Sequence, residues 1–178
     1  MTFDPYRDDL KEYWFANPVD ALVHDTLEFR HPAFVEAGAP VAVRIVRAAT
    51  DIVATLEASA PFQAGQSVTF RALAFALTPP ESPERGLPQI DLAIDNATAD
   101  LMPWLELAAA SFAPVELSYR QYLDSDLTAP AYVLHGLTAK RVRGDMVRIT
   151  GSAGFENLLG RAFPDQIYTL EVYRGLAR

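Results

Sequence analysis

Few residues of this chain have the type and spacing that catalysis requires. The three histidines, His24, His31 and His135, stand alone, and none has a metal-binding spacing such as HxH or HExxH. The clearest carboxylate pair is Asp91 and Asp95, which fall on the same side of an alternating run. Four residues along a strand separate them by about 13 Å, beyond the distance that glycosidases use. We therefore expect no catalytic, cofactor-binding or metal site, and a carboxylate-based hydrolase is the least favoured alternative.

The sequence also lacks the common nucleophile and phosphate-binding motifs. Residues 151–154 (Gly-Ser-Ala-Gly) are close in composition to a nucleophile elbow but do not have its Gly-x-Ser-x-Gly spacing. Neither a P-loop nor a Gly-x-Gly-x-x-Gly run occurs. The 178 residues include no cysteine, which excludes disulfides, thiolate metal sites and iron–sulfur ligation. On these grounds we predict that the protein is not an enzyme.

The charge of the chain is strongly acidic, with one basic exception. The formal net charge is −8, and such a surface repels the phosphates of nucleic acids. Four cations gather around one expected hairpin: Lys140, Arg141, Arg143 and Arg148. Basic residues at a strand edge deter stray strand pairing. The alternative is that this patch meets an acidic face of a neighbour or a phosphate backbone.

Length and composition predict one globular domain over residues 1–178. Half of the residues are apolar and about a fifth are charged. No stretch approaches the roughly 20 apolar residues of a membrane span, so we expect no membrane insertion. The acidic start, residues 1–9, has no basic region typical of a signal peptide. The absence of cysteine fits folding in a reducing cytoplasm.

Residues 67–96 are the stretch around which the rest of the chain is organised. In its first half, every second residue is apolar, first at the even positions Val68, Phe70 and Ala72 and then at the odd positions Leu73, Phe75 and Leu77. Successive side chains of a strand point to opposite faces, so this slip predicts a bulge or a change of partner. The proline-rich residues 78–86 cannot continue a ladder, and alternation resumes at Ile90. The stretch therefore predicts a hairpin-like β unit with a long loop.

The other elements follow from periodicity and from turn residues. We expect strands over residues 21–29, 41–47, 115–123, 132–142 and 146–150, with His31 and Pro32 ending the first, and residues 49–57 form either a third strand or a bend into it. The main helix is expected over about residues 99–112, capped at Ala99 or Asp100, with Pro103 in its first turn. A short helix is expected over 153–164, and the tail, 168–178, across the sheet. These elements predict a mainly β sandwich or barrel-like domain with minor α content.

Residues 1–20 are expected to form an N-terminal helical arm, with the helix over 4–15. Its apolar residues, Leu10, Tyr13 and Trp14, lie on one face. Two interpretations stay open. The arm packs on its own core, or it reaches onto a neighbouring subunit.

Five runs of the chain resemble a known family: residues 26–34 (TLEFRHPAF), 51–57 (DIVATLE), 68–75 (VTFRALAF), 86–96 (GLPQIDLAIDN) and 153–164 (AGFENLLGRAFP). They resemble an uncharacterised domain family encoded in tail modules of long-tailed, siphovirus-type bacteriophages and prophages. The similarity runs from about residue 26 to the C-terminus, and its strongest parts are 91–96 and 161–164. Neither part contains a catalytic residue, so the resemblance specifies a family and no reaction.

A weaker likeness connects the chain to the tail-tip hub proteins of lambda-like phages, which carry a Cys-rich iron–sulfur segment that this chain lacks. The resemblance implies a virion component of the tail tip or baseplate, a homo-oligomeric ring of three copies or alternatively six. Its implied neighbours are the distal tail protein, the central-fibre or receptor-binding hub and the tape-measure protein. DNA would pass only in transit, along a channel side rich in Asp and Glu. The alternative is a monomeric β-sandwich binding module with an enclosed aromatic pocket, unrelated to virions.

Overall fold

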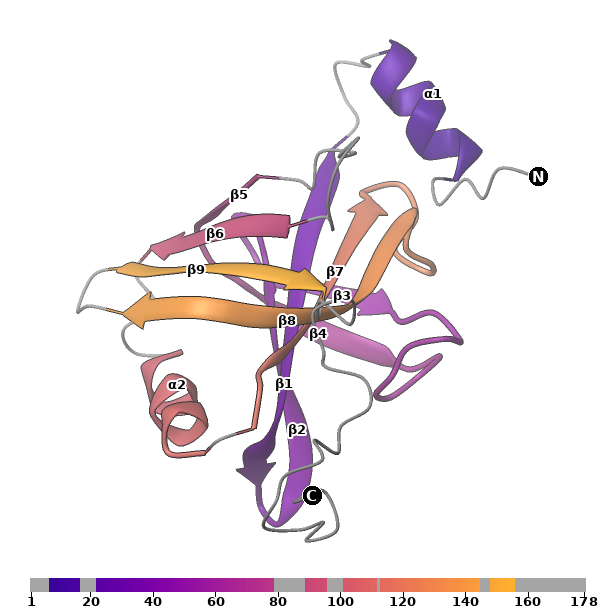
Figure 1. Ribbon diagram of the computed structural model, residues 1–178. Coiled ribbons are helices and arrows are strands. Elements are labelled where there is room, and N and C mark those ends of the chain that lie inside the picture. Colours follow the sequence, from indigo (N-terminus) through magenta and orange to yellow (C-terminus); the bar gives the residue numbers. More distant parts are fainter. Residues whose placement is uncertain are drawn as a thin grey trace, which may run out of the picture.

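The computed structural model describes residues 7–16, 22–78, 89–95, 101–111, 113–144 and 148–155. Their helices and strands are shown in Figure 1. In chain order they are α1 (Asp8–Ala16), β1 (Val23–Glu36), β2 (Ala39–Val46), β3 (Ile52–Thr55), β4 (Ser67–Ala72), β5 (Phe75–Thr78), β6 (Gln89–Asp95), α2 (Met102–Ala109), β7 (Glu116–Leu123), β8 (Tyr132–Gly144) and β9 (Arg148–Phe155). The prediction of a mainly β fold is confirmed.

All of these strands belong to one mixed sheet, in the order β3-β4-β2-β1-β7-β8-β9-β6-β5. Strands β4 and β5 lie near opposite ends of this order, yet only Leu73 and Ala74 separate them in the chain. The Leu73 N–H donates to the Val46 carbonyl at 3.0 Å, and the Asp95 N–H donates to the Ala74 carbonyl at 3.0 Å. The two ends of the sheet therefore meet, and the sheet curls into a barrel-like form (Figure 1).

The main hydrophobic core fills the inside of the curled sheet. In β6 every second residue, Ile90, Leu92 and Ile94, is buried there, as alternation requires. Leu10 of α1 and Leu101 beside α2 belong to the same core. The two helices lie at different ends of the sheet, α1 at the top and α2 at the lower left of Figure 1. Each helix thus helps to close one end of the barrel-like core.

A second, smaller core lies on the outer face of the sheet. It combines Val46 of β2 and Tyr122 of β7 with residues of β3, β4 and the segment 56–66, namely Ala54, Leu56, Ala60 and Phe70. The Tyr122 hydroxyl donates to the Thr55 carbonyl at 3.0 Å. The segment 56–66 is therefore held over the outer face of β1, β2 and β7.

The phase slip predicted near residue 73 is confirmed as a change of partner strand. Before it, β4 pairs antiparallel with β3 and briefly parallel with β2. After it, β5 pairs antiparallel with β6, and Phe75 lies opposite Ile94. The predicted proline-rich loop falls mostly on residues 79–88, outside the described residues.

His31 and Pro32 do not end the first strand, contrary to the prediction. Strand β1 continues to Glu36, and its register with β2 shifts between Arg30 and Val35. Its pairing with β7 ends at Arg30. Pro32 therefore lies where β1 has no ladder partner among the described strands, so its missing N–H removes no sheet hydrogen bond.

The predicted helix over 153–164 is wrong at its beginning. Ala153 and Phe155 belong to β9, where Ala153 pairs with Ile90 of β6 and with Ala139 of β8. Strand pairing on both sides overrides the local helical pattern. The remainder of that helix and the tail, 156–178, lie outside the described residues.

The main helix is shorter than predicted, Met102–Ala109, and Pro103 lies in its first turn as expected. Leu101 occupies the N-cap position and makes no side-chain capping hydrogen bond. The predicted caps, Ala99 and Asp100, fall outside the described residues. The other strands match their predicted positions within a few residues, except that β9 continues past residue 150.

Helix α1 begins at Asp8 and packs on its own chain. Leu10 is completely buried, and the Arg7 N–H donates to the Ala131 carbonyl at 3.1 Å. At the other end of the helix, Phe15 is 90 % exposed. The side chains of Tyr13 and Trp14 lie outside the described part of the structure. The packing of Leu10 corresponds to the first of the two interpretations of the arm.

Candidate functional site

Six ionisable side chains lie together where the segment 56–66 covers the outer face of the sheet. We call them the buried charged network: Glu28, Arg30, Arg44, Glu57, Arg120 and His135. Glu28 and Arg120 are completely buried, and the side chains of Arg44 and Glu57 are 10 % and 13 % exposed. Charged residues are rarely buried to this extent unless they are paired.

Strand alternation and register bring the network together. Every second residue of β1 points to the outer face, which places Thr26 and Glu28 side by side there. Glu28 lies opposite Arg44 of β2 and opposite Ser118 of β7. Thr26 lies opposite Arg120 of β7, so Arg120 is a diagonal neighbour of Glu28.

Glu28 is the carboxylate at the centre of the network. Arg44 Nε donates to Glu28 Oε2 at 2.8 Å, and Arg44 Nη2 donates to Gln63 Oε1 at 2.8 Å. Arg120 Nη1 lies 3.7 Å from Glu28 Oε2, and Arg30 Nε lies 3.6 Å from Glu28 Oε1. Three guanidinium groups thus surround one buried carboxylate, which offsets the cost of removing it from water.

Glu57 binds Arg120 from the segment 56–66. Arg120 donates to both of its carboxylate oxygens, from Nε to Oε2 at 2.9 Å and from Nη2 to Oε1 at 2.9 Å. His135 Nε2 lies 2.8 Å from Glu57 Oε1. Burial alone would raise the pKa of Glu57, but the neighbouring His135 and Arg120 lower that pKa to about 2. Glu57 is therefore ionised at neutral pH and fastens the segment to the sheet.

Several buried polar atoms of the network make no hydrogen bond within the described residues: Glu28 Oε1, Arg30 Nε, Arg120 Nη1 and His135 Nε2. Glu28 Oε1, Arg30 Nε and Arg120 Nη1 nevertheless lie within 4 Å of an opposite charge, and His135 Nε2 lies within 4 Å of the Glu57 carboxylate. Charge attraction, in addition to directed hydrogen bonds, therefore holds the network. Such an arrangement is sensitive to the loss of any one member, because the partner left behind is a buried charge.

Ser118, His135 and Glu57 form a row whose residue types match a Ser-His-Glu hydrolase triad. Ser118 Oγ lies 3.0 Å from His135 Nδ1, and Glu57 Oε1 lies 2.8 Å from Nε2. A nucleophile must reach its substrate, but Ser118 is completely buried in β7. Glu57 is also engaged by Arg120. In this arrangement the row links β7, β8 and the segment 56–66, and its hydroxyl is not presented to solvent.

The predicted carboxylate pair lies elsewhere, on exposed positions of β6. Asp95 is opposite Arg148 of β9, and Arg148 Nε lies 3.0 Å from Asp95 Oδ1 in an exposed ion pair. Asp91 is opposite Thr78 and Ser152. Neither aspartate joins the buried charged network.

The three histidines have separate polar neighbours. His24 Nε2 lies 2.9 Å from Asp124 Oδ1, and His31 Nε2 lies 3.1 Å from the Ala113 carbonyl oxygen. His135 belongs to the network. Over the described residues, no group of three or more His, Cys, Asp or Glu side chains is placed to hold a metal ion.

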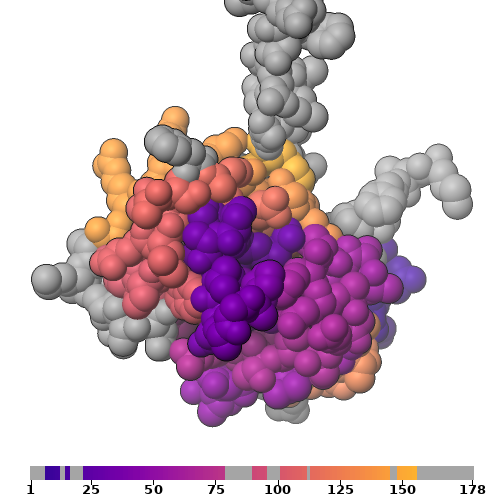
Figure 2. All heavy atoms as spheres, turned by 90° about the horizontal axis from the view of Figure 1, so that it is seen from below, coloured from indigo at the N-terminus to yellow at the C-terminus, as the bar shows by residue number. Residues whose placement is uncertain are grey.

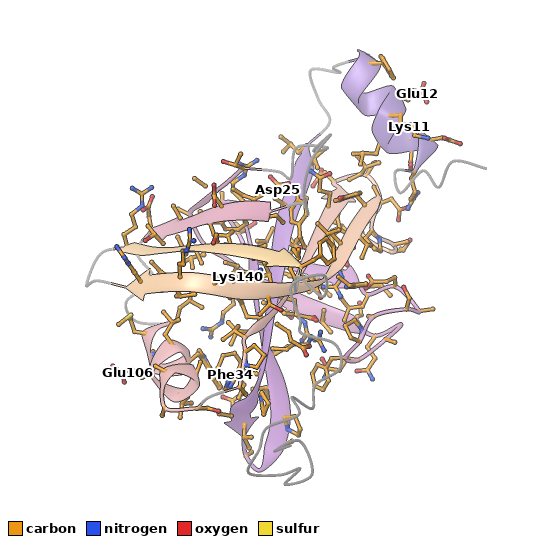
Figure 3. All side chains as sticks on the ribbon, viewed as in Figure 1. Lys11, Glu12, Asp25, Phe34, Glu106 and Lys140 are labelled. Carbon is orange, nitrogen blue, oxygen red and sulfur yellow. The ribbon has the colours of Figure 1, made fainter. Side chains whose placement is uncertain are left out.

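The predicted basic cluster lies along the β8–β9 hairpin and is exposed. Beyond Ala139, β8 pairs with β9 but with no other described strand. Lys140, labelled on β8 in Figure 3, donates from Nζ to the Phe155 carbonyl at 3.0 Å. Arg141 has a positive φ of 53°, at the point where the β8–β9 register shifts. Lys140, Arg141 and Arg143 therefore lie at a strand edge, in agreement with the first interpretation, whereas Arg148 lies on β9 opposite Asp95 of β6.

A groove of about 670 Å³ opens between β2, β4 and the start of α2. Seen from below, the end of the β1–β2 hairpin lies between α2 on one side and the β3–β4 region on the other (Figure 2). Apolar residues of the groove include Leu73, Leu101, Pro103 and Trp104, and its charged residues are Glu36, Arg44, Asp51 and Arg71. The groove therefore combines an apolar wall with a polar rim of both signs.

One side of this groove is an open strand edge. Strand β4 pairs with β2 only at Ile45 and Val46. Residues 39–44 of β2 pair with β1 on one side, and with no described strand on the other. We call residues 39–44 the open β2 edge.

The direction of the backbone groups on the open β2 edge follows from one hydrogen bond. The Val46 carbonyl accepts from Leu73 on the β4 side. Backbone groups alternate in direction along a strand, so Ala42 and Arg44 also direct their N–H and C=O groups outward. Pro40 offers only its carbonyl there. The open β2 edge therefore presents donors and acceptors to the groove.

Sequence reasoning missed both the network and the groove. Residues 26–30 and 116–120 alternate between polar and apolar, which is typical of strands with one face in water. The segment that covers this face, 56–66, is distant in sequence, so no local pattern reveals the cover. The pairing of Glu28, Arg30 and Arg120 with opposite charges would have indicated the network. That pairing can be recognised only once the strand register is known.

Comparisons with known proteins identify one family whose model covers most of the chain. Within the described residues, no helix is long and apolar enough to cross a membrane. A search of curated proteins returned no match. A family model described as a domain of unknown function, DUF1833, matches residues 9–168, a range that extends from α1 past the end of β9. The chain therefore belongs to the DUF1833 family.

Proposed function

We propose that this chain is a structural subunit of the tail tip, or baseplate, of a long-tailed bacteriophage. It folds in the host cytoplasm and acts in the virion. Its copies form a hub ring, three or alternatively six, between the distal tail protein and the central-fibre or receptor-binding proteins. The tape-measure protein lies inside, and DNA passes in transit. The sequence resemblance to tail-module proteins motivates this proposal, since the DUF1833 description assigns no activity.

The observation that carries the proposal is the open β2 edge beside its groove. Native proteins usually blunt or cover unpaired strand edges, because such edges pair readily with other chains. Here residues 39–44 adjoin a groove of about 670 Å³. Ala42 and Arg44 direct backbone groups toward it, as the β2 register requires. Such an edge supports the proposal, because it offers a surface on which another chain of the assembly can pair.

The charge of the chain supports a place around a DNA channel. The net charge of −8 gives a surface that does not retain DNA. The proposal puts Asp and Glu on the channel side. A ring whose bore is lined by Lys and Arg would contradict it.

A monomeric binding module is the second candidate, and the cavity under α2 bears on it. This cavity is lined by aromatic residues, among them Phe29, Phe34 and Trp104. Phe34, labelled beside α2 in Figure 3, contacts Trp104 with ring centroids 5.2 Å apart. Its volume is about 70 Å³. Ligand pockets commonly measure about 300–1,000 Å³, so the cavity favours a packing role over a ligand site.

The mass of the purified particle and its shape test the proposal. We expect light scattering to give three or six copies per particle, and negative-stain electron microscopy to show rings. Co-expression with tail proteins encoded beside it should yield a complex. The control is the same chain in high denaturant, which must give the mass of one copy. A single copy under native conditions that binds no tail protein would contradict the proposal.

A further inference from the structure

We propose that the open β2 edge is completed by a strand from the C-terminal segment of a second copy, residues 167–173. This inference rests on the proposed function, because it supplies the contact between neighbouring copies in the ring. An extended segment that joins a free sheet edge is a common mode of protein recognition.

The groove has the shape and chemistry that such a strand requires. The backbone groups of Ala42 and Arg44 provide the ladder contacts. Alternate side chains of an added strand would point to opposite sides of the sheet. On the side of Val43 they would meet the apolar residues Leu101 and Trp104, which line the same cavity as Val43. On the opposite side they would meet the face that holds Ala42 and Arg44.

The C-terminal segment has the matching pattern in its sequence, Ile-Tyr-Thr-Leu-Glu-Val-Tyr. Tyr168, Leu170 and Val172 fall on one face of an extended chain, and Thr169, Glu171 and Tyr173 fall on the other. β-branched and aromatic residues are frequent in strands. The apolar face suits the wall at Trp104, and Glu171 would lie on the side of Arg44.

The position of this segment in the chain permits exchange between copies. Strand β9 ends at Phe155, and the residues from 156 to 166 span at most about 36–40 Å when extended. Donor segment and acceptor edge are different surfaces of one chain, so each copy can donate to the next. Such head-to-tail contacts close into a ring when the rotation between copies allows it.

Disulfide trapping tests this contact cleanly, because the chain contains no cysteine. Two full-length variants with different tags are co-expressed, one with Ala42→Cys and the other with Thr169→Cys or Glu171→Cys. Oxidation should join the two chains, since facing side chains on one side of a sheet meet the distance that a disulfide needs. The matched control is Leu170→Cys, whose side chain falls on the opposite face. We expect at least tenfold more cross-linked product than with this control.

The outcomes separate this inference from the proposed function. A further full-length variant carries Ala42→Cys and Glu171→Cys in the same chain. A disulfide that forms within this chain, with none between the two singly substituted chains, would show that the segment covers its own edge and would overturn the exchange. Equal cross-linking by Leu170→Cys would show random collision, and would also overturn it. A ring mass without any trapped disulfide would reject the exchange and leave the tail-tip proposal standing. A wild-type chain with the mass of one copy would contradict the tail-tip proposal itself.

Discussion

Strand β1 lies between two buried regions, the main hydrophobic core and the buried charged network, which are stabilised by different forces. On its inner face, Leu27 is completely buried in the apolar core. On its outer face, Glu28 is equally buried but is surrounded by guanidinium groups. Apolar burial is non-directional and depends on volume, whereas a buried ion network depends on complete pairing and on protonation. One strand thus shows that equal burial does not imply equal sensitivity to mutation or pH.

The largest expected effect is the loss of Arg120. Replacing it by leucine leaves Glu28 and Glu57 without their shared partner, and breaking a buried pair costs about 3–5 kcal/mol. Urea unfolding of Arg120→Leu against the wild type measures this loss. The double variant Glu57→Leu, Arg120→Leu should recover part of it. A loss below about 1 kcal/mol would show that the network is not energetically coupled.

Truncation on the inner face should cost somewhat less and should behave differently. Leu27→Ala removes buried methyl groups, and we expect a loss of about 3 kcal/mol in the free energy of unfolding. The loss should be the same at pH 7 and pH 4, because no ionisable group is removed. Urea titrations at both pH values check this. A strongly pH-dependent loss would show that the hydrophobic core and the buried charged network are not independent.

Acidification should weaken the buried charged network through Glu57. Its folded pKa of about 2 is below the unfolded value, so its stabilising contribution is present above pH 4.5 and is lost as the pH falls toward 2. The lowering of this pKa from 4.5 to about 2 corresponds to an expected loss of about 3 kcal/mol at pH 2. The difference in stability between the wild type and Glu57→Gln, followed from pH 6 to pH 2, isolates this group. The difference should shrink over that range, and a constant difference would contradict the assignment.

The smallest effect is expected on the exposed β6–β9 pair. Asp95 and Arg148 are both about half exposed. Surface ion pairs contribute about 0–1 kcal/mol, so Arg148→Ala should change the unfolding free energy by less than about 0.5 kcal/mol. The same urea titration measures this change and provides the exposed counterpart to Arg120→Leu. Effects of equal size at the two arginines would remove the contrast between buried and exposed pairs.

The parts of the fold that the sequence predicts well are those set by local alternation. The change of phase at Leu73, the strand from Ile90 to Ile94 and the first-turn position of Pro103 are all visible in local patterns. Pro32 misled the prediction, because its effect depends on whether the neighbouring strand needs its N–H. The residues at 153–155 misled it as well, since pairing with two neighbouring strands decides their conformation.

The candidate site was less predictable because it depends on contacts between distant segments. Glu57 and Arg120 are 63 residues apart, yet they make the bidentate pair that fastens the covering segment. Nothing local distinguishes Glu28 from a solvated glutamate on an exposed strand face. The open β2 edge could not be predicted for a similar reason. Its exposure depends on β4, which pairs with β2 only at Ile45 and Val46.

The short link at Leu73 and Ala74 has a mechanical consequence. Around the rest of the circumference, neighbouring strands are joined by hydrogen bonds, which can be pulled apart one after another under load. At this link, covalent bonds of the chain connect the two ends of the sheet and hold the barrel-like form closed. A single cut between these two residues would leave every hydrogen bond of the sheet in place. The covalent connection would be lost, however, and the curled sheet could open.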